Sequence, residues 1–141
     1  MRRITKIFAP LVVLLGIGLA GCDISTLVNA TGPKEEVEFA KHYVMLFQAR
    51  DFSMIEAQLD PNLRNAQLRA KLEQIAATFP NESPRSANLV GWRINSNFTS
   101  GVKTYVLNFQ YAYPTRTVNV EIVLERNSDQ RVVRGFHVRT A

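Results

Sequence analysis

The stretch VKTYVLNFQYAYPTRTVNVEIVLE (102–125) decides the fold, because it has the pattern of two long strands joined by a tight turn. Large apolar side chains alternate with polar ones on both sides of Pro114-Thr115, which is typical of strands with one buried face. A turn at this dipeptide places three apolar pairs opposite one another: Tyr111–Val118, Phe109–Val120 and Leu107–Ile122. The stretch therefore predicts an antiparallel hairpin with one continuous apolar face.

Two further strands are predicted beside the strands Val102–Tyr113 and Thr115–Glu125, namely Ala87–Phe98 before them and Arg131–Arg139 after them. A turn at Ser100-Gly101 predicts the pairs Ile94–Leu107, Trp92–Phe109 and Val90–Tyr111. A loop at Asn127–Asp129 predicts the pairs Leu124–Val132, Val120–Phe136 and Val118–Val138, and it leaves Val123 and Val133 on the polar face. The sequence thus predicts a four-stranded antiparallel meander with one apolar face.

Three helices are predicted ahead of the strands, in Lys34–Ala49, Phe52–Leu59 and Leu63–Phe79. The first carries apolar residues at helical spacing: Val37, Ala40, Tyr43, Val44 and Phe47. Asp51 is expected to cap the second helix, and Asp60-Pro61 to start the third. The predicted fold class is α+β, with three N-terminal helices packed on the curved four-stranded sheet in one globular domain, residues 32–141.

Residues 1–21 have the pattern of a secretory signal. Three basic residues lie within Met1–Lys6, and the apolar run Ile7–Leu19 is shorter than the about 20 residues that a membrane-spanning helix needs. The run ends in Leu19-Ala20-Gly21-Cys22, which resembles the lipobox of bacterial lipoproteins. The resemblance implies cleavage before Cys22 and lipidation of its thiol, with residues 22–31 as a lipidated tether. Cys22 is the only cysteine, so a disulfide within the chain is excluded.

The lipobox implies a protein of the bacterial cell envelope that is anchored in the membrane and faces the periplasm. Asp23 resembles the signal that retains lipoproteins in the inner membrane of enterobacteria; under other sorting rules it carries no such meaning. The chain has 17 basic and 12 acidic residues, and three of the basic ones precede Cys22, so the mature part has 14 against 12, a net charge of +2. This small charge does not indicate a nucleic-acid partner.

The order of helices and strands resembles that of the nuclear transport factor 2-like superfamily, whose fold is a cystatin-like cone. The resemblance is carried by the corner between the first two helices: Phe47, then Asp51-Phe52, Ile55, Leu59 and Pro61. It covers roughly residues 33–141. Many members have an extra strand between the second and third helices, for which Leu59–Leu63 leaves no room. Because the superfamily contains isomerases, dehydratases, cyclases and non-catalytic binding domains, the resemblance implies a fold rather than a function. Its members often pair through the exposed sheet face, so a homodimer is one arrangement that it implies.

The sequence does not assemble a catalytic constellation. Glu121 and Glu125 are expected on the polar face of the sheet, and Asp51 and Asp60 are expected to cap helices. The only histidines, His42 and His137, lie on different elements, so we expect neither a metal nor another cofactor.

Arg134 is the one charged residue in the predicted apolar stripe of the last strand. One interpretation is a cationic group in a ligand pocket, with the hydroxyls of Tyr105 and Tyr111 nearby. The other is that Gly135 hosts a bulge that turns Arg134 outward, or that the guanidinium extends past the edge of the core.

The sequence therefore favours a membrane-anchored envelope lipoprotein that works as a non-catalytic binding or assembly module. Its partner would be an envelope protein or a small ligand, besides the membrane that holds Cys22. The alternative is an isomerase- or cyclase-like enzyme that uses a cone cavity lined by Arg134 and tyrosines.

Overall fold

The computed structural model describes residues 24–141, so the predicted signal, the lipobox with Cys22 and the sorting residue Asp23 lie outside the described residues. The helices come first: α1 (Ile24–Thr31), α2 (Lys34–Gln48), α3 (Phe52–Gln58), the short 3-10 helix η1 (Pro61–Leu63) and α4 (Leu68–Thr78). The strands follow: β1 (Ser86–Ser96), β2 (Lys103–Ala112), β3 (Thr117–Arg126) and β4 (Arg131–Thr140). Among residues 24–141, no helix combines the length and the apolar character needed to cross a membrane.

The strands form one open antiparallel sheet in the order β1-β2-β3-β4, which confirms the α+β class and the four-stranded meander. The β2–β3 hairpin has the predicted register, with the pairs Tyr111–Val118, Phe109–Val120 and Leu107–Ile122. The connection is tight, because the backbone N–H of Tyr113 donates to the carbonyl of Arg116 at 2.9 Å. A short connection fixes the register of the strands that it joins, which is why the sequence sufficed here.

The predicted register of β1 against β2 is wrong by two residues: Trp92 lies opposite Leu107 rather than Phe109. The connecting loop is longer than the predicted two-residue turn. It is closed by a hydrogen bond from the backbone N–H of Asn97 to the carbonyl of Val102, at 2.9 Å. Gly101 has φ +70°, a left-handed conformation that favours glycine, and it completes the loop.

Further along β1, a bulge between Leu89 and Gly91 shifts the pairing of β1 with β2 by one residue. It turns Leu89 into the core, where its side chain is fully buried, and leaves Val90 exposed. The prediction that Val90 contributes to the apolar face is therefore wrong, and Leu89 takes that place.

The predicted register of β4 against β3 is also wrong, because the connecting loop extends to Gln130, one residue beyond the prediction, and a bulge then adds a residue to β4 at Arg134. Val133 rather than Val132 lies opposite Leu124, and Val133 is fully buried rather than on the polar face. After the register shift, Phe136 lies opposite Ile122. Arg134 falls between the pairs on either side of the shift and has no cross-strand partner.

The first two predicted helices are confirmed within one residue at their ends. The five predicted apolar residues of α2 are all buried: Val37, Ala40, Tyr43, Val44 and Phe47. Asp51 caps α3, since its carboxylate accepts a hydrogen bond from the backbone N–H of Met54 at 3.2 Å. The third predicted helix begins too early, because α4 starts only at Leu68. The side chains of Asp60 and Asn65 accept hydrogen bonds from backbone N–H groups two residues on and hold this stretch in turns.

Part of the predicted tether is helical, so residues 24–141 contain four α-helices rather than three. Helix α1 is fastened to the edge strand β1, because the side-chain oxygen of Asn29 accepts a hydrogen bond from the backbone N–H of Leu89 at 3.0 Å. Gly32 ends the helix at a close approach: a Cβ atom at this position would lie 2.6 Å from Cδ2 of Leu89.

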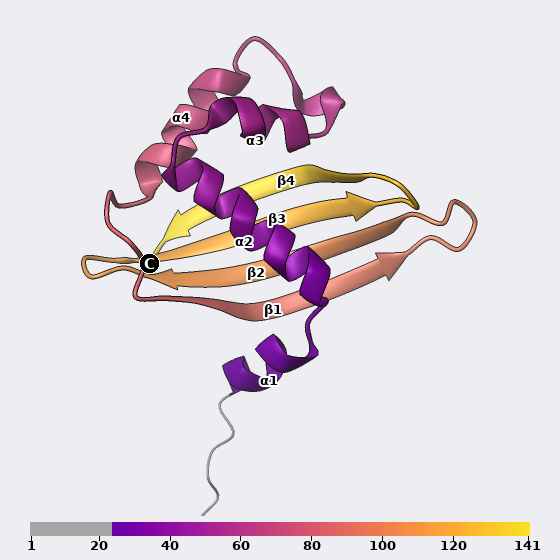
Figure 1. Cartoon of the computed structure of the whole chain (residues 1–141), viewed down its shortest axis with the longest axis horizontal. Helices are drawn as coiled ribbons and strands as arrows, with labels where there is room; N and C mark the ends of the chain where they lie inside the picture. The colour runs from indigo at the N-terminus through magenta and orange to yellow at the C-terminus, as the bar shows by residue number, and fades with distance from the viewer. Residues whose placement is uncertain (1–23) are drawn as a thin grey trace, which may run out of the picture.

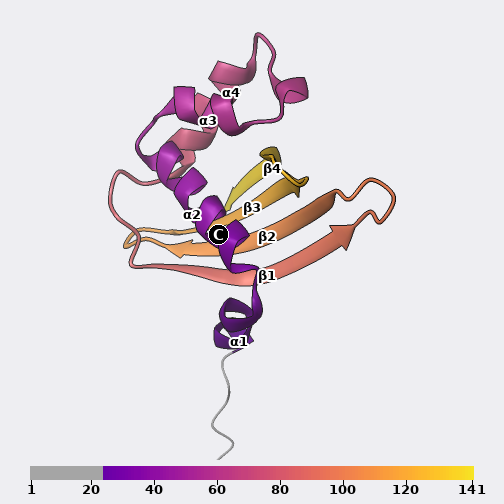
Figure 2. The same ribbon diagram turned by 45° about the vertical axis from the view of Figure 1, so that its right-hand side comes forward.

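The helices lie on one side of the twisted sheet and at its two edges (Figures 1 and 2). Helix α2 crosses one face diagonally, α3 and α4 lie on the β4 side, and α1 lies below β1. A single parallel bridge joins Leu59 to Val133, and the backbone N–H of Asp60 donates to the carbonyl of Val133 at 2.9 Å. This bridge ties the connection after α3 to the bulge in β4.

Candidate functional site

A groove of about 380 Å³ lies between β4, the C-terminal half of α2, and α4. Its floor is aromatic. The rings of Phe47 and Phe136 stack with centroids 4.5 Å apart, and Tyr43 meets Phe136 edge-on at 5.6 Å. Phe47 and Tyr43 are buried, whereas Phe136 is only partly buried. The groove therefore presents apolar ring surface to whatever enters it.

The late start of α4 shapes the rim of this groove. Because residues between η1 and α4 are not helical, Leu63 is not packed under a helix and remains 39% exposed over the groove. Leu72 and Ile75 of α4 form the facing wall, and Lys71 stands at the edge. The continuous helix over Leu63–Phe79 that the sequence predicts is not formed.

Arg134 also lines this groove, but its guanidinium is engaged by two carboxylates. Its Nη1 lies 2.6 Å from Oδ2 of Asp60, and its Nε lies 3.5 Å from Oε2 of Glu125. Asp60 is buried, and its other oxygen accepts a hydrogen bond from the backbone N–H of Asn62. The Arg134–Asp60 pair thus fastens the connection between α3 and α4 to the bulge of β4, and it stabilises the rim of the groove.

The structure does not bring together the three residues that the sequence suggests as a pocket. Tyr105 and Tyr111 lie six residues apart on β2, about 20 Å along an extended strand. Tyr105 lines a separate hollow, and the groove with Arg134 contains neither residue. The hydroxyl of Tyr111 is buried without a hydrogen-bond partner among the described residues, and burial raises the pKa of Tyr111.

The tyrosine that does share the groove with Arg134 is Tyr43. Its hydroxyl donates a hydrogen bond to the backbone carbonyl of Ile55 at 3.4 Å, and burial raises its pKa, so the hydroxyl stays protonated. The helical spacing of α2 predicts Tyr43 as a core residue, which is correct. Its place on the groove depends on the position of β4, which the sequence does not fix.

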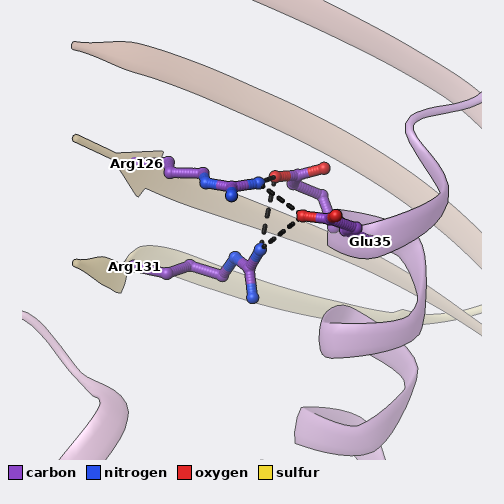
Figure 3. Close-up of polar contacts among 4 residues, drawn as sticks. Glu35, Arg126 and Arg131 are labelled. Carbon is purple, nitrogen blue, oxygen red and sulfur yellow. Dashed lines mark hydrogen bonds and ion pairs between the residues drawn. The ribbon is translucent and has the colours of Figure 1, made fainter. Parts of the chain in front are cut away.

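A second feature is a cluster of ion pairs between the first turn of α2 and the β3–β4 hairpin, shown in Figure 3. Nη1 of Arg126 lies 2.7 Å from a carboxylate oxygen of both Glu35 and Glu36. Nη2 of Arg131 lies 3.4 Å from Oε1 of Glu36. The guanidinium of Arg131 also stacks on the ring of Phe39, 5.0 Å from its centroid.

The ion pairs of this cluster shift the pKa values of Glu35 and Arg126. The hydrogen bond from Arg126 lowers the pKa of Glu35, and the hydrogen bonds to Glu36 and Glu35 raise the pKa of Arg126. The sequence gives only a weak signal for it: two acidic residues open a helix, and Arg126 and Arg131 flank a loop 90 positions later.

The two histidines lie on different elements, and one of them lines the groove. His42 is exposed on α2, whereas His137 lines the groove and lies opposite Glu121 in the β3–β4 register. Within residues 24–141, no three side chains of His, Cys, Asp or Glu gather closely enough to hold a metal ion.

Comparison of the chain with models of protein families, with curated proteins and with solved structures finds no match.

Proposed function

We propose that this chain is a bacterial envelope lipoprotein, anchored through Cys22, whose domain works by binding at the groove between β4 and α4. The observation that carries the binding role is the chemistry of the groove. Its floor is aromatic and partly exposed, and of the two basic residues at its edge, Arg134 and Lys71, Arg134 is already paired with Asp60 and Glu125. Such a surface favours an apolar side chain or a small apolar molecule.

The same contacts argue for binding over catalysis. A general base or acid must reach the substrate with a free lone pair or proton. Two of the polar groups at this groove are engaged: the Tyr43 hydroxyl is bonded to a carbonyl, and the Asp60 carboxylate is shared between Arg134 and a backbone N–H. Lys71 and His137 also line the groove. The isomerase- or cyclase-like alternative uses Arg134 with tyrosine hydroxyls. Tyr105 and Tyr111 do not line the groove, and the hydroxyl of Tyr43, which shares the groove with Arg134, is bonded to the carbonyl of Ile55.

The proposed fold family is the nuclear transport factor 2-like superfamily with its cystatin-like cone. Three features support it: helices that precede an antiparallel meander, the Asp51 cap at the first corner, and the parallel bridge between Leu59 and Val133. That bridge is a single residue pair, and it lies at the place in the chain where many members have an extra strand.

The proposed location is the periplasmic side of a membrane, with the inner membrane favoured where enterobacterial sorting rules apply to Asp23. The test of the anchor is the mass of the protein purified from bacterial membranes. We expect the mass of a chain that starts at Cys22 and carries acyl chains, and we expect Cys22→Ala to release the domain from the membrane fraction. An unmodified Cys22 contradicts the anchor.

The test of the groove uses an uncharged solvatochromic dye, Nile red, whose emission rises in apolar sites. Leu63→Gln places a polar amide over the groove, and we expect it to weaken dye binding by about tenfold. Met54→Gln is the matched control, since Met54 is 44% exposed on α3, outside the groove, and Leu63 is 39% exposed. Equal dye binding by both variants shows that the groove is not the binding site.

A further inference from the structure

Four large apolar side chains remain exposed along β1 and the loop that follows it, and three of them lie apart from Val90, which lines a hollow with Asn108 and Asn119. Trp92 is 38% exposed, Ile94 is 39% exposed, and Phe98, in the β1–β2 loop, is 97% exposed. Trp92 and Ile94 lie opposite Leu107 and Tyr105, so both are on the face of the sheet that α2 crosses. We refer to Trp92, Ile94 and Phe98 as the β1 patch.

The N-terminal helix lies directly beside this patch. A Cβ atom at Gly32, where α1 ends, would lie 3.6 Å from Cδ1 of Trp92, so the joint between α1 and α2 rests on the indole. The hydrogen bond from Leu89 to Asn29 fixes α1 to the same strand. Helix α1 has 8 residues, about 12 Å of length, and it begins two positions after Cys22. Along the chain, the proposed anchor at Cys22 is separated from the joint at Gly32 only by Asp23 and this short helix.

Positive charge lies next to the patch as well. A hollow of about 600 Å³ is lined by Tyr105, Lys34 and Lys103, and Tyr105 is the cross-strand partner of Ile94. Neither lysine makes an ion pair with another residue of the described chain. The two carboxylates that also line the hollow, those of Glu35 and Glu36, are matched by the guanidinium groups of Arg126 and Arg131. The lysines thus give the hollow its surplus charge.

We propose that the β1 patch rests in the interface of the bilayer that holds Cys22, with Lys34 and Lys103 against anionic phospholipid headgroups. This inference rests on the proposed lipid anchor. Tryptophan and other amphipathic or apolar side chains favour the membrane interface, and lysines near the surface are attracted to anionic lipid. A patch of three side chains is too small to hold a free protein at a membrane firmly, but the anchor keeps the bilayer at high local concentration. The anchor and the patch together would set the orientation of the domain on the membrane.

The experiment uses the complete lipoprotein, reconstituted in vesicles of phosphatidylethanolamine and phosphatidylglycerol. Trp92 is the only tryptophan of the chain, so its emission reports on the patch alone. Phospholipids brominated near the headgroup end of their acyl chains quench a tryptophan at the interface. We expect at least about twofold quenching of Trp92 by these lipids, and weaker quenching by lipids brominated near the bilayer centre.

Two variants test the contacts. Phe98→Ser removes the most exposed apolar side chain, and the double change Lys34→Glu with Lys103→Glu reverses the local charge; each is expected to reduce the quenching by at least about half. The matched control is Met45→Ser, because Met45 is 58% exposed on α2, away from the patch, and its loss should leave the quenching unchanged. A reduction in Met45→Ser equal to that in Phe98→Ser overturns the proposal.

The outcomes separate the patch from the anchor. Lipidated protein that floats with the vesicles while Trp92 stays unquenched overturns the docking of the patch and leaves the anchor intact. Unmodified Cys22 overturns the anchor and, with it, the docking of the patch, because the patch is too small to hold a free chain at the membrane. Shielding of Trp92 from an aqueous quencher in detergent, rising with protein concentration, assigns the patch to a second copy of the chain and likewise overturns the proposal.

Discussion

Replacing Glu36 by glutamine removes the charge through which α2 is joined to the β3–β4 hairpin. The Glu36 side chain is only 5% exposed, and its Oε1 lies 2.7 Å from Nη1 of Arg126 and 3.4 Å from Nη2 of Arg131. The two arginines come from strands that follow α2 in the chain by about 90 residues. The interaction is therefore available only in the folded domain, and its loss should appear fully in the free energy of unfolding.

The expected size follows from burial and geometry. A hydrogen bond to a charged group contributes about 1.5–3 kcal/mol, and removing one member of a buried ion pair costs about 3–5 kcal/mol. Two features reduce the cost: the Arg126 side chain is 39% exposed, so water screens it, and glutamine keeps the volume and one acceptor oxygen. We expect Glu36→Gln to destabilise the domain by about 2 kcal/mol, which lowers the Tm of a domain of this size by about 8 °C.

The assay is urea unfolding followed by circular dichroism, with thermal unfolding as the second measurement. Glu38→Gln is the matched control on the same helix, because the Glu38 side chain is 77% exposed and lies 3.9 Å from Lys41. We expect the control to lose less than about 0.5 kcal/mol. A loss in Glu36→Gln no larger than in Glu38→Gln refutes the conclusion that a buried, paired carboxylate fastens α2 to the hairpin.

Three further changes test other parts of the domain. Phe136→Ala removes the ring that stacks on Phe47 at 4.5 Å and should cost about 3 kcal/mol in urea unfolding, whereas a loss below about 1 kcal/mol contradicts the packing described. The hydrogen bond from Arg126 lowers the pKa of Glu35 from its usual 4.5, so this carboxylate stabilises the fold above that pH and loses its effect as the pH falls through the lowered pKa. Unfolding measured between about pH 5 and about pH 3 should therefore show a shallower loss of stability in Glu35→Gln than in the wild type, and equal slopes contradict the assignment. Gly101→Ala should lower the stability by about 1 kcal/mol, because φ +70° strains any residue with a Cβ, and an unchanged thermal midpoint shows that the loop adapts.

The sequence by itself determines the class of the domain and its local elements. The alternation in Val102–Glu125 and the tight turn at Pro114 fix the central hairpin and its register, because a short connection allows only one pairing that buries every large apolar side chain. The periodicity of α2 likewise identifies its buried face, and Asp51 identifies the start of α3. These features depend on residues that are close together in the chain.

Tertiary structure decides the rest, and bulges are the first reason. A bulge adds one residue to one strand and reverses which side chains lie inside. The bulge in β4 lies beside Gly135, where the sequence offers one as an alternative, whereas the sequence does not predict the bulge in β1. The sequence suggests that Arg134 is either a pocket cation or a residue turned outward. The structure contains a part of each interpretation. The bulge leaves Arg134 beside the groove, and the carboxylate of Asp60, 74 positions earlier, neutralises the charge of its guanidinium.

Long-range contacts are the second reason. The opening of the groove depends on the late start of α4, where the turns formed by Asp60 and Asn65 replace a turn of helix. The cluster that joins α2 to the hairpin requires side chains about 90 residues apart to meet. Periodicity and turn chemistry act over a few residues and therefore give the elements, whereas the site depends on which elements pack together, a choice made by the free energy of the whole core.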